Sequence, residues 1–203
     1  MITFRACLWA ASMNDQLTDG EKQILLRLAR EAMDHAVRGM KLPPLENESL
    51  SPRLRENGAS FVTLTIHGEL RGCIGALEAY QPLADDVREH AIAAALSDPR
   101  FPPVGENELN RIKLEVSRLT VPQLLEYSSG EELPVKLRPH VDGVILKDGF
   151  RRATFLPQVW EQIPDAEDFL DHLCSKMGAR RDLWRKTKLQ VYIYQVEEFH
   201  EMN

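Results

Sequence analysis

The dipeptide Asp148-Gly149 lies between two largely apolar segments, Val144–Lys147 and Phe150–Phe155. This arrangement is the strongest short-range indication of a β-hairpin, because glycine adopts the positive φ that a tight hairpin turn requires. A hairpin pairs its strands antiparallel, whereas a doubly wound sheet consists of parallel strands joined by helices. Helical patterns also occur between the strand patterns. We therefore predict an α+β fold with antiparallel sheets and flanking helices, and not a doubly wound sheet.

The remaining elements follow from the spacing of apolar residues. Thr18 and Glu21 form a capping-box pattern before a helical repeat, which predicts a helix that ends near Gly39. Further helices are expected over Pro82–Ser97 and Phe169–Met177. Further strands are expected over Phe61–Ile66, Leu114–Thr120 and Leu189–Val196. Proline makes two segments irregular, Asp98–Pro103 and Lys41–Asn57, and the second is a candidate lid.

Length and charge limit the classes of protein that the chain can form. Its 203 residues suffice for one large domain or two closely packed lobes. We expect a loose N-terminal extension over residues 1–17, the domain over 18–199 and a C-terminal tail over 200–203. The net charge of −6 argues against a nucleic-acid partner, since phosphate neutralisation needs clustered basic residues. No apolar run reaches the ~18 residues of a membrane span, so we expect no membrane partner. We also expect the protein to be a monomer or a weak homodimer.

The cysteines indicate the compartment and exclude several kinds of site. There are three of them, Cys7, Cys73 and Cys174, and they are far apart in the chain. This odd number predicts no disulfide framework, and the spacing matches no zinc site, so we expect a cytoplasmic protein without a bound metal. Neither a P-loop nor a dinucleotide-binding glycine motif occurs, and we expect no cofactor. Cys174 lies on the apolar stripe of its helix and is expected in the core.

One segment combines glycines with a cysteine and an arginine. In Arg71-Gly72-Cys73-Ile74-Gly75, the two glycines predict a tight turn or a close approach of another backbone. A cysteine held near a guanidinium can react as the thiolate. The alternative is a buried, structural cysteine in a bulge at the end of a strand, because free cysteine is usually a small core residue.

Charged residues elsewhere complete a candidate site around Cys73. Asp98 and Arg100 lie in the stiff proline segment, and the single helix before it can return them to the cysteine, so we predict one shared cleft. In this hypothesis Cys73 is the nucleophile, and Glu115 or a histidine handles protons. Arg71 and Arg100 hold a small anionic substrate, and Asp98 is part of the same binding site. The N–H groups near Gly72 and Gly75 are further anion donors. The alternative is two unrelated surface turns.

The histidines do not single out a general base. The candidates are His67, His90, His140 and His172. His90 is four residues after Asp86, which places the two on one helix face. We interpret them as a solvated surface pair, because no third metal ligand is close in sequence.

Several separated motifs resemble one known family. They are Leu70-Arg71-Gly72-Cys73-Ile74-Gly75, Ser97-Asp98-Pro99-Arg100-Phe101-Pro102-Pro103, Val116-Ser117-Arg118-Leu119-Thr120, Asp142-Gly143-Val144-Ile145-Leu146, Ala153-Thr154-Phe155-Leu156-Pro157-Gln158-Val159-Trp160 and Phe169-Leu170. In this order they are similar to an AMMECR1 domain over Thr18–Phe199. The resemblance implies an α+β fold with a larger and a smaller lobe, each built on antiparallel sheet. It further implies a cytosolic protein resembling protein A of the AmmeMemoRadiSam system, associated with a Memo-like protein and a radical SAM protein.

The resemblance does not imply a reaction, so two functions remain open. The first is a cysteine-dependent enzyme or modifying factor that acts at the Arg71–Gly75 segment on an anionic substrate. The second is a non-catalytic binding or adaptor module that works with the Memo-like and radical SAM proteins. An exposed Cys73 beside a base favours the first, and a buried Cys73 in an apolar environment favours the second.

Overall fold

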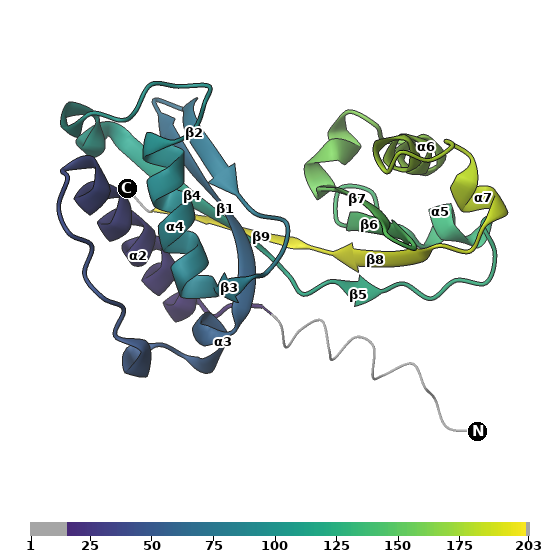
Figure 1. Ribbon diagram of the computed structural model, residues 1–203, viewed down its shortest axis with the longest axis horizontal. Helices are drawn as coiled ribbons and strands as arrows, with labels where there is room; N and C mark the ends of the chain where they lie inside the picture. Colours follow the sequence, from purple (N-terminus) through teal and green to yellow (C-terminus); the bar gives the residue numbers. More distant parts are fainter. Residues whose placement is uncertain (1–15, 202–203) are drawn as a thin grey trace. The chain divides into compact units, whose positions relative to one another are not determined.

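The structure is a computed structural model that describes residues 16–201, and it contains two compact units (Figure 1). Of the described residues, the first unit comprises 16–120 together with 197–201, and the second comprises Val121–Val196. Each unit contains helices and its own antiparallel sheet, which confirms the predicted α+β class. None of the described helices is both long and apolar enough to cross a bilayer.

The first unit is built on a five-stranded sheet of order β2-β1-β4-β9, in which β3 also pairs with β1. The strands are β1 (Asn57–Ile66), β2 (Glu69–Gly75), β3 (Gln81–Pro82), β4 (Ile112–Leu119) and β9 (Val196–His200). The helices are α2 (Asp19–Val37), α3 (Pro52–Arg55) and α4 (Leu83–Leu96), with short 3-10 helices at Asn47–Ser49 and Glu106–Arg111. The predicted capping box is present at the start of α2, where Thr18 and Glu21 each satisfy a backbone N–H of the other.

Helices α2 and α4 cover one face of this sheet (Figure 1). Val62, Leu64 and Val116 are completely buried on that face, as the alternation of the strands predicts. The opposite face carries the intervening residues, which include Thr63 and Glu115. The sheet therefore has one face that forms the core and one that is not covered by α2 and α4.

The prediction of a tight turn at Gly72–Gly75 is wrong, because Glu69–Gly75 is strand β2. The turn lies earlier, at His67 and Gly68, whose φ angles of 54° and 85° are those of a two-residue hairpin turn. Strand β2 contains one extra residue, Arg71, at a bulge where its register with β1 shifts. The bulge directs the Arg71 side chain out of the regular alternation.

The glycines of β2 are required for close packing instead of for a turn. A Cβ atom on Gly72 would lie 2.2 Å from the carbonyl oxygen of Ala94 in α4. On Gly75 it would lie 2.4 Å from the carbonyl oxygen of Ser60 and from the Phe61 ring. Glycine permits such an approach because it has no side chain. Gly72 thus lets β2 lie directly against the backbone of α4.

The second unit contains a four-stranded sheet of order β5-β8-β6-β7. The strands are β5 (Gln123–Leu124), β6 (Gly143–Asp148), β7 (Arg151–Phe155) and β8 (Gln190–Tyr194). The helices are α5 (Glu132–Lys136), α6 (Ala166–Lys176) and α7 (Leu183–Lys186), with a 3-10 helix at Pro157–Glu161. The predicted hairpin is confirmed, since Asp148 pairs with Arg151 and Gly149 has a φ of 60°. Cys174 is fully buried in α6, as expected.

The interpretation of Asp86 and His90 as a solvated surface pair is wrong. Asp86 is completely buried and His90 is 5% exposed. The Ser60 hydroxyl donates to the Asp86 carboxylate at 2.6 Å, and the Nδ1 atom of His90 lies 3.2 Å from the same oxygen. Helix α4 packs against both α2 and the sheet, so it buries more than one apolar stripe and its polar residues must find partners inside.

Candidate functional site

The backbone of Cys73 is held by Asp98 and Arg100. The N–H of Cys73 donates to the Asp98 carboxylate at 2.8 Å, and the Arg100 guanidinium donates to the Cys73 carbonyl at 3.1 Å. Strand β2 is at the edge of the sheet, where peptide groups lack a neighbouring strand. The two side chains therefore take the place of a strand at this position. The structure brings Cys73, Asp98 and Arg100 together, as the spacing of the motifs predicts, whereas the shared cleft stays a prediction.

Asp98 and Arg100 also bind each other. Two nitrogens of the Arg100 guanidinium donate to Asp98 at 2.9 and 2.6 Å, and the backbone N–H of Arg100 adds a third bond. These bonds from Arg100 hold the pKa of Asp98 well below its ordinary value, and the N–H of Cys73 adds to the effect. The pKa of Arg100 is raised, mainly by Asp98 and to a smaller extent by Cys73. Both residues thus remain charged over the whole physiological pH range.

Arg71 fixes the proline segment that follows α4. It donates to both carboxylate oxygens of Glu108, at 2.8 and 3.1 Å, and to the carbonyl oxygen of Pro102 at 2.9 Å. This bidentate pair lowers the pKa of Glu108. Two guanidinium groups lie near the Phe101 ring, that of Arg71 at 6.0 Å and that of Arg100 at 5.6 Å from its centroid. Arg71 is therefore committed to intramolecular contacts, whereas the Arg100 side chain is 52% exposed.

The Cys73 side chain belongs to a row of three residues on adjacent strands. Cys73 pairs with Thr63 of β1, and Thr63 pairs with Glu115 of β4. Directly paired residues share a face, so all three lie on the face that α2 and α4 do not cover. The Thr63 hydroxyl donates to the Cys73 sulfur at 3.3 Å. We name these residues, Cys73, Thr63 and Glu115, the thiol row.

The electrostatic environment of Glu115 suits a proton acceptor. Burial raises the pKa of its carboxyl group, Glu198 raises it further, and His200 has the opposite effect. Adjacent strands are ~4.8 Å apart, so Glu115 and Cys73 are separated by about two strand spacings. A proton can move between them only through the Thr63 hydroxyl or a water molecule.

The structure also shows which residues the sequence interpretation missed. Thr63 and His200 were not predicted, since their proximity depends on how β1, β4 and β9 pair. Among the predicted histidines, His67 lies in the β1–β2 turn and His90 is bonded to Asp86. The other two, His140 and His172, lie in the second unit. Only the strand alternation around Phe61–Ile66 indicates in advance that Thr63 can share a face with a neighbouring cysteine.

No three of the histidine, cysteine, aspartate and glutamate side chains within residues 16–201 are arranged to hold a metal ion. The prediction that purified protein carries no stoichiometric metal can be tested by elemental analysis.

Comparison with known proteins identifies the family. The family model AMMECR1 matches residues 26–199, which is most of the chain. The chain belongs to the AMMECR1 family. A protein of Methanothermobacter thermautotrophicus is 42% identical to it over 186 residues, covering 91% of this chain and 96% of the relative. Protein MJ0810 of Methanocaldococcus jannaschii is 37% identical and covers 92% of both chains.

A solved structure shows the same AMMECR1 fold. The crystal structure of uncharacterized protein PH0010 from Pyrococcus horikoshii matches with a TM-score of 0.71 and 36% sequence identity. The match covers 91% of this chain and 93% of that one. The motifs that resemble an AMMECR1 domain thus lie in a chain with that fold.

We expect Cys73 to react faster with iodoacetamide than Cys174. Cys73 is partly exposed, whereas Cys174 is fully buried and burial raises the pKa of its thiol. The rates should differ at least ~10-fold at neutral pH, since the thiolate must be both formed and accessible. Peptide mass spectrometry measures the extent of alkylation at each cysteine. Cys7 lies outside the described residues, and its alkylation is measured separately. Equal rates in the folded protein would contradict the expectation.

Proposed function

We propose that this AMMECR1-domain protein acts through Cys73, as a cysteine-dependent enzyme or modifying factor. The hydrogen bond from the Thr63 hydroxyl to the Cys73 sulfur is the observation that carries the proposal. A hydroxyl that donates to sulfur stabilises the thiolate, which is the nucleophilic form. Glu115 then takes the thiol proton through a water molecule, because the Thr63 hydroxyl donates its own proton to the sulfur, and the raised pKa of Glu115 matches that role. Because the reaction needs a free thiol, we place it in the reducing cytoplasm.

The proposed substrate is small and anionic. Arg100 has a half-exposed guanidinium that already contacts the Cys73 carbonyl, so its outer edge is available to an incoming anion. Arg71 and Asp98 act indirectly, since they hold the proline segment and the Cys73 backbone in position. Gly72 and Gly75 allow the close packing that places this strand. Of the five predicted binding residues, Arg100 thus contacts the anion. The other four position the site, and they are Arg71, Gly72, Gly75 and Asp98.

The Thr63 hydrogen bond can be tested by replacing Thr63 with valine, which has nearly the same shape. We expect the alkylation of Cys73 at neutral pH to slow by about 10-fold, because a hydrogen bond to a charged group contributes roughly 1.5 kcal/mol or more. Thr65→Val is the matched control, since Thr65 lies two residues along the same strand and pairs with Leu70 instead. Iodoacetamide rates measured from pH 6 to 9 give the pH dependence. Equal slowing in both variants, or in neither, would contradict the proposed role of Thr63.

A second candidate function is a non-catalytic adaptor that binds a Memo-like protein and a radical SAM protein. The observation that favours it is the use of Arg71, Asp98 and Arg100 to hold the β2 edge in one conformation. A rigid edge with the half-exposed Leu70 on it is a recognition surface that needs no thiol chemistry. Copurification of the three proteins with Cys73→Ser separates the two functions. An adaptor retains its partners in this variant, and partner binding that depends on the thiol favours the first candidate.

A further inference from the structure

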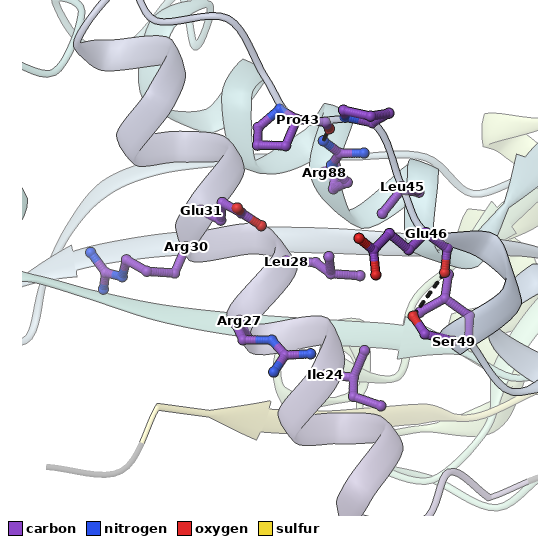
Figure 2. Close-up of a pocket in the computed structure, with 12 residues that line it drawn as sticks. Ile24, Arg27, Leu28, Arg30, Glu31, Pro43, Leu45, Glu46, Ser49 and Arg88 are labelled. Carbon is purple, nitrogen blue, oxygen red and sulfur yellow. Dashed lines mark hydrogen bonds between the residues drawn. The ribbon is translucent and has the colours of Figure 1, made fainter.

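A pocket of about 500 Å³ lies in the first unit between α2 and the segment Pro43–Leu50 (Figure 2). Its apolar wall is formed by Ile24 and Leu28 of α2 and by Leu45 of the loop. The volume is within the range of ~300–1,000 Å³ that is usual for sites of small organic ligands. The pocket is on the helical side of the sheet, whereas the thiol row is on the opposite face. It is therefore a separate site.

Arg88 of α4 lines this pocket and has no counter-charge among the described residues. The residue is only 7% exposed, and its guanidinium donates to the carbonyl oxygen of Pro43. Its Nε atom is buried without a hydrogen-bond partner, and no carboxylate among residues 16–201 forms an ion pair with it. A buried guanidinium is normally paired, because the cost of removing it from water must be offset. An anion in the pocket would supply the missing charge.

Two carboxylates line the same pocket. Glu31 of α2 and Glu46 of the loop extend toward each other across it (Figure 2). Neither forms an ion pair with a described residue. Arg30 provides the contrast, because it also borders the pocket but points away, and Glu201 pairs with it. The pocket therefore presents separate positive and negative groups that the described part of the protein leaves unpaired.

We propose that this pocket binds a small zwitterion with an apolar body, such as an apolar amino acid or a dipeptide. The carboxylate of the ligand pairs with Arg88, which has no counter-ion within residues 16–201. The ammonium group binds Glu31 and Glu46. The apolar side chains of the ligand pack on Ile24, Leu28 and Leu45, so that this apolar wall and the charged groups of Arg88, Glu31 and Glu46 each have a complementary part of the ligand.

The ligand charges can be tested by isothermal titration calorimetry of the full chain with leucyl-leucine. Two derivatives each remove one charge: N-acetyl-leucyl-leucine lacks the ammonium, and leucyl-leucinamide lacks the carboxylate. We expect the dipeptide to bind, and each derivative to bind about 10-fold more weakly, the effect of one charge-assisted hydrogen bond. Absence of binding by the dipeptide at millimolar concentration would overturn the proposal. So would an affinity that is the same for all three compounds.

Two variants assign the charges to residues. Arg88→Gln should weaken the dipeptide and its N-acetyl form about 10-fold and leave leucyl-leucinamide unchanged. Glu46→Gln should weaken the dipeptide and the amide and leave the N-acetyl form unchanged. The control is Arg55→Gln, an exposed arginine in the same unit that does not line the pocket.

Each result of this comparison supports or overturns the proposal. If Arg88→Gln and Arg55→Gln changed the affinity for the dipeptide equally, the assignment of the ligand carboxylate to Arg88 would be overturned. Arg88 would then only stabilise the Pro43 loop. If Arg88→Gln does not fold, Glu46→Gln decides, since it changes a loop side chain that forms no ion pair with the part of the chain that the structure describes. A Glu46→Gln protein that binds all three compounds as the native protein does would overturn the assignment of the ammonium site.

Discussion

Replacing Gly72 with alanine is expected to destabilise the first unit by about 3 kcal/mol, the upper end of the usual cost of overpacking. The new Cβ would lie 2.2 Å from the carbonyl oxygen of Ala94, a backbone atom that cannot rotate away. Either β2 must separate from α4, or α4 must shift on the sheet. Both movements disturb the core that Val62 and Leu64 form beneath the helix. Urea denaturation followed by far-UV circular dichroism measures the change in the free energy of unfolding.

The control for this prediction is Gly20→Ala. Gly20 lies in the first turn of α2, where an added Cβ has nothing within 4 Å. The same substitution should stabilise this helix by ~0.5–1 kcal/mol, because alanine loses less backbone entropy than glycine. A Gly72→Ala protein as stable as native would show that β2 does not depend on contact with α4. It would also remove the structural reason for this glycine.

Replacing Asp98 with alanine is expected to destabilise the protein by about 2–3 kcal/mol, because the change removes charge-assisted hydrogen bonds from a buried carboxylate. Asp98 is 5% exposed and accepts bonds from the backbone of Cys73 and Arg100 and from the Arg100 side chain. The ion pair itself accounts for less of this value than the geometry suggests, since Arg100 is 52% exposed and solvent screens its charge. Most of the loss comes from the N–H groups left without an acceptor. Urea denaturation at pH 7 measures the change.

The same carboxylate makes stability depend on pH. The pKa of Asp98 is lowered in the folded protein relative to ~3.9 in an unfolded chain. The unfolded state therefore binds a proton at higher pH than the folded state does. The contribution of Asp98 is fully present above about pH 4 and is lost as the pH falls further, toward the folded pKa. The stability of the native protein should decrease over this acidic range more steeply than that of Asp98→Ala.

Asp85→Ala is the control for both Asp98 experiments. Asp85 lies in the first turn of α4, at the end of the helix remote from Asp98. Its replacement should cost only ~0.3–1 kcal/mol, the usual effect of an acidic residue on a helix dipole. If Asp98→Ala and Asp85→Ala were equally stable and equally sensitive to acid, Asp98 would not be needed to hold the Cys73 backbone.

Several features of this AMMECR1 protein could be predicted from its sequence because they depend on neighbouring residues. The Asp148-Gly149 turn and the capping box of Thr18 and Glu21 are set by the conformations that these residues prefer within a few positions. The burial of Cys174 follows from the repeat of a single helix. The approach of Asp98 and Arg100 to Cys73 was predictable from the length of the one helix between them, together with the family motifs.

The tertiary structure alone decided which residues meet across strands and between helices. The thiol row exists because β1 pairs with β2 and β4 in one register, and a shift of one residue would move Thr63 to the other face. The close contact of Gly72 with Ala94 and the burial of Asp86 and His90 depend on where α4 packs. Arg88 is held against a distant loop, whose Pro43 carbonyl accepts its hydrogen bond, and no carboxylate of the described residues pairs with it. Such contacts join residues far apart in the chain, so no local preference specifies them, and the packing of the whole unit selects them.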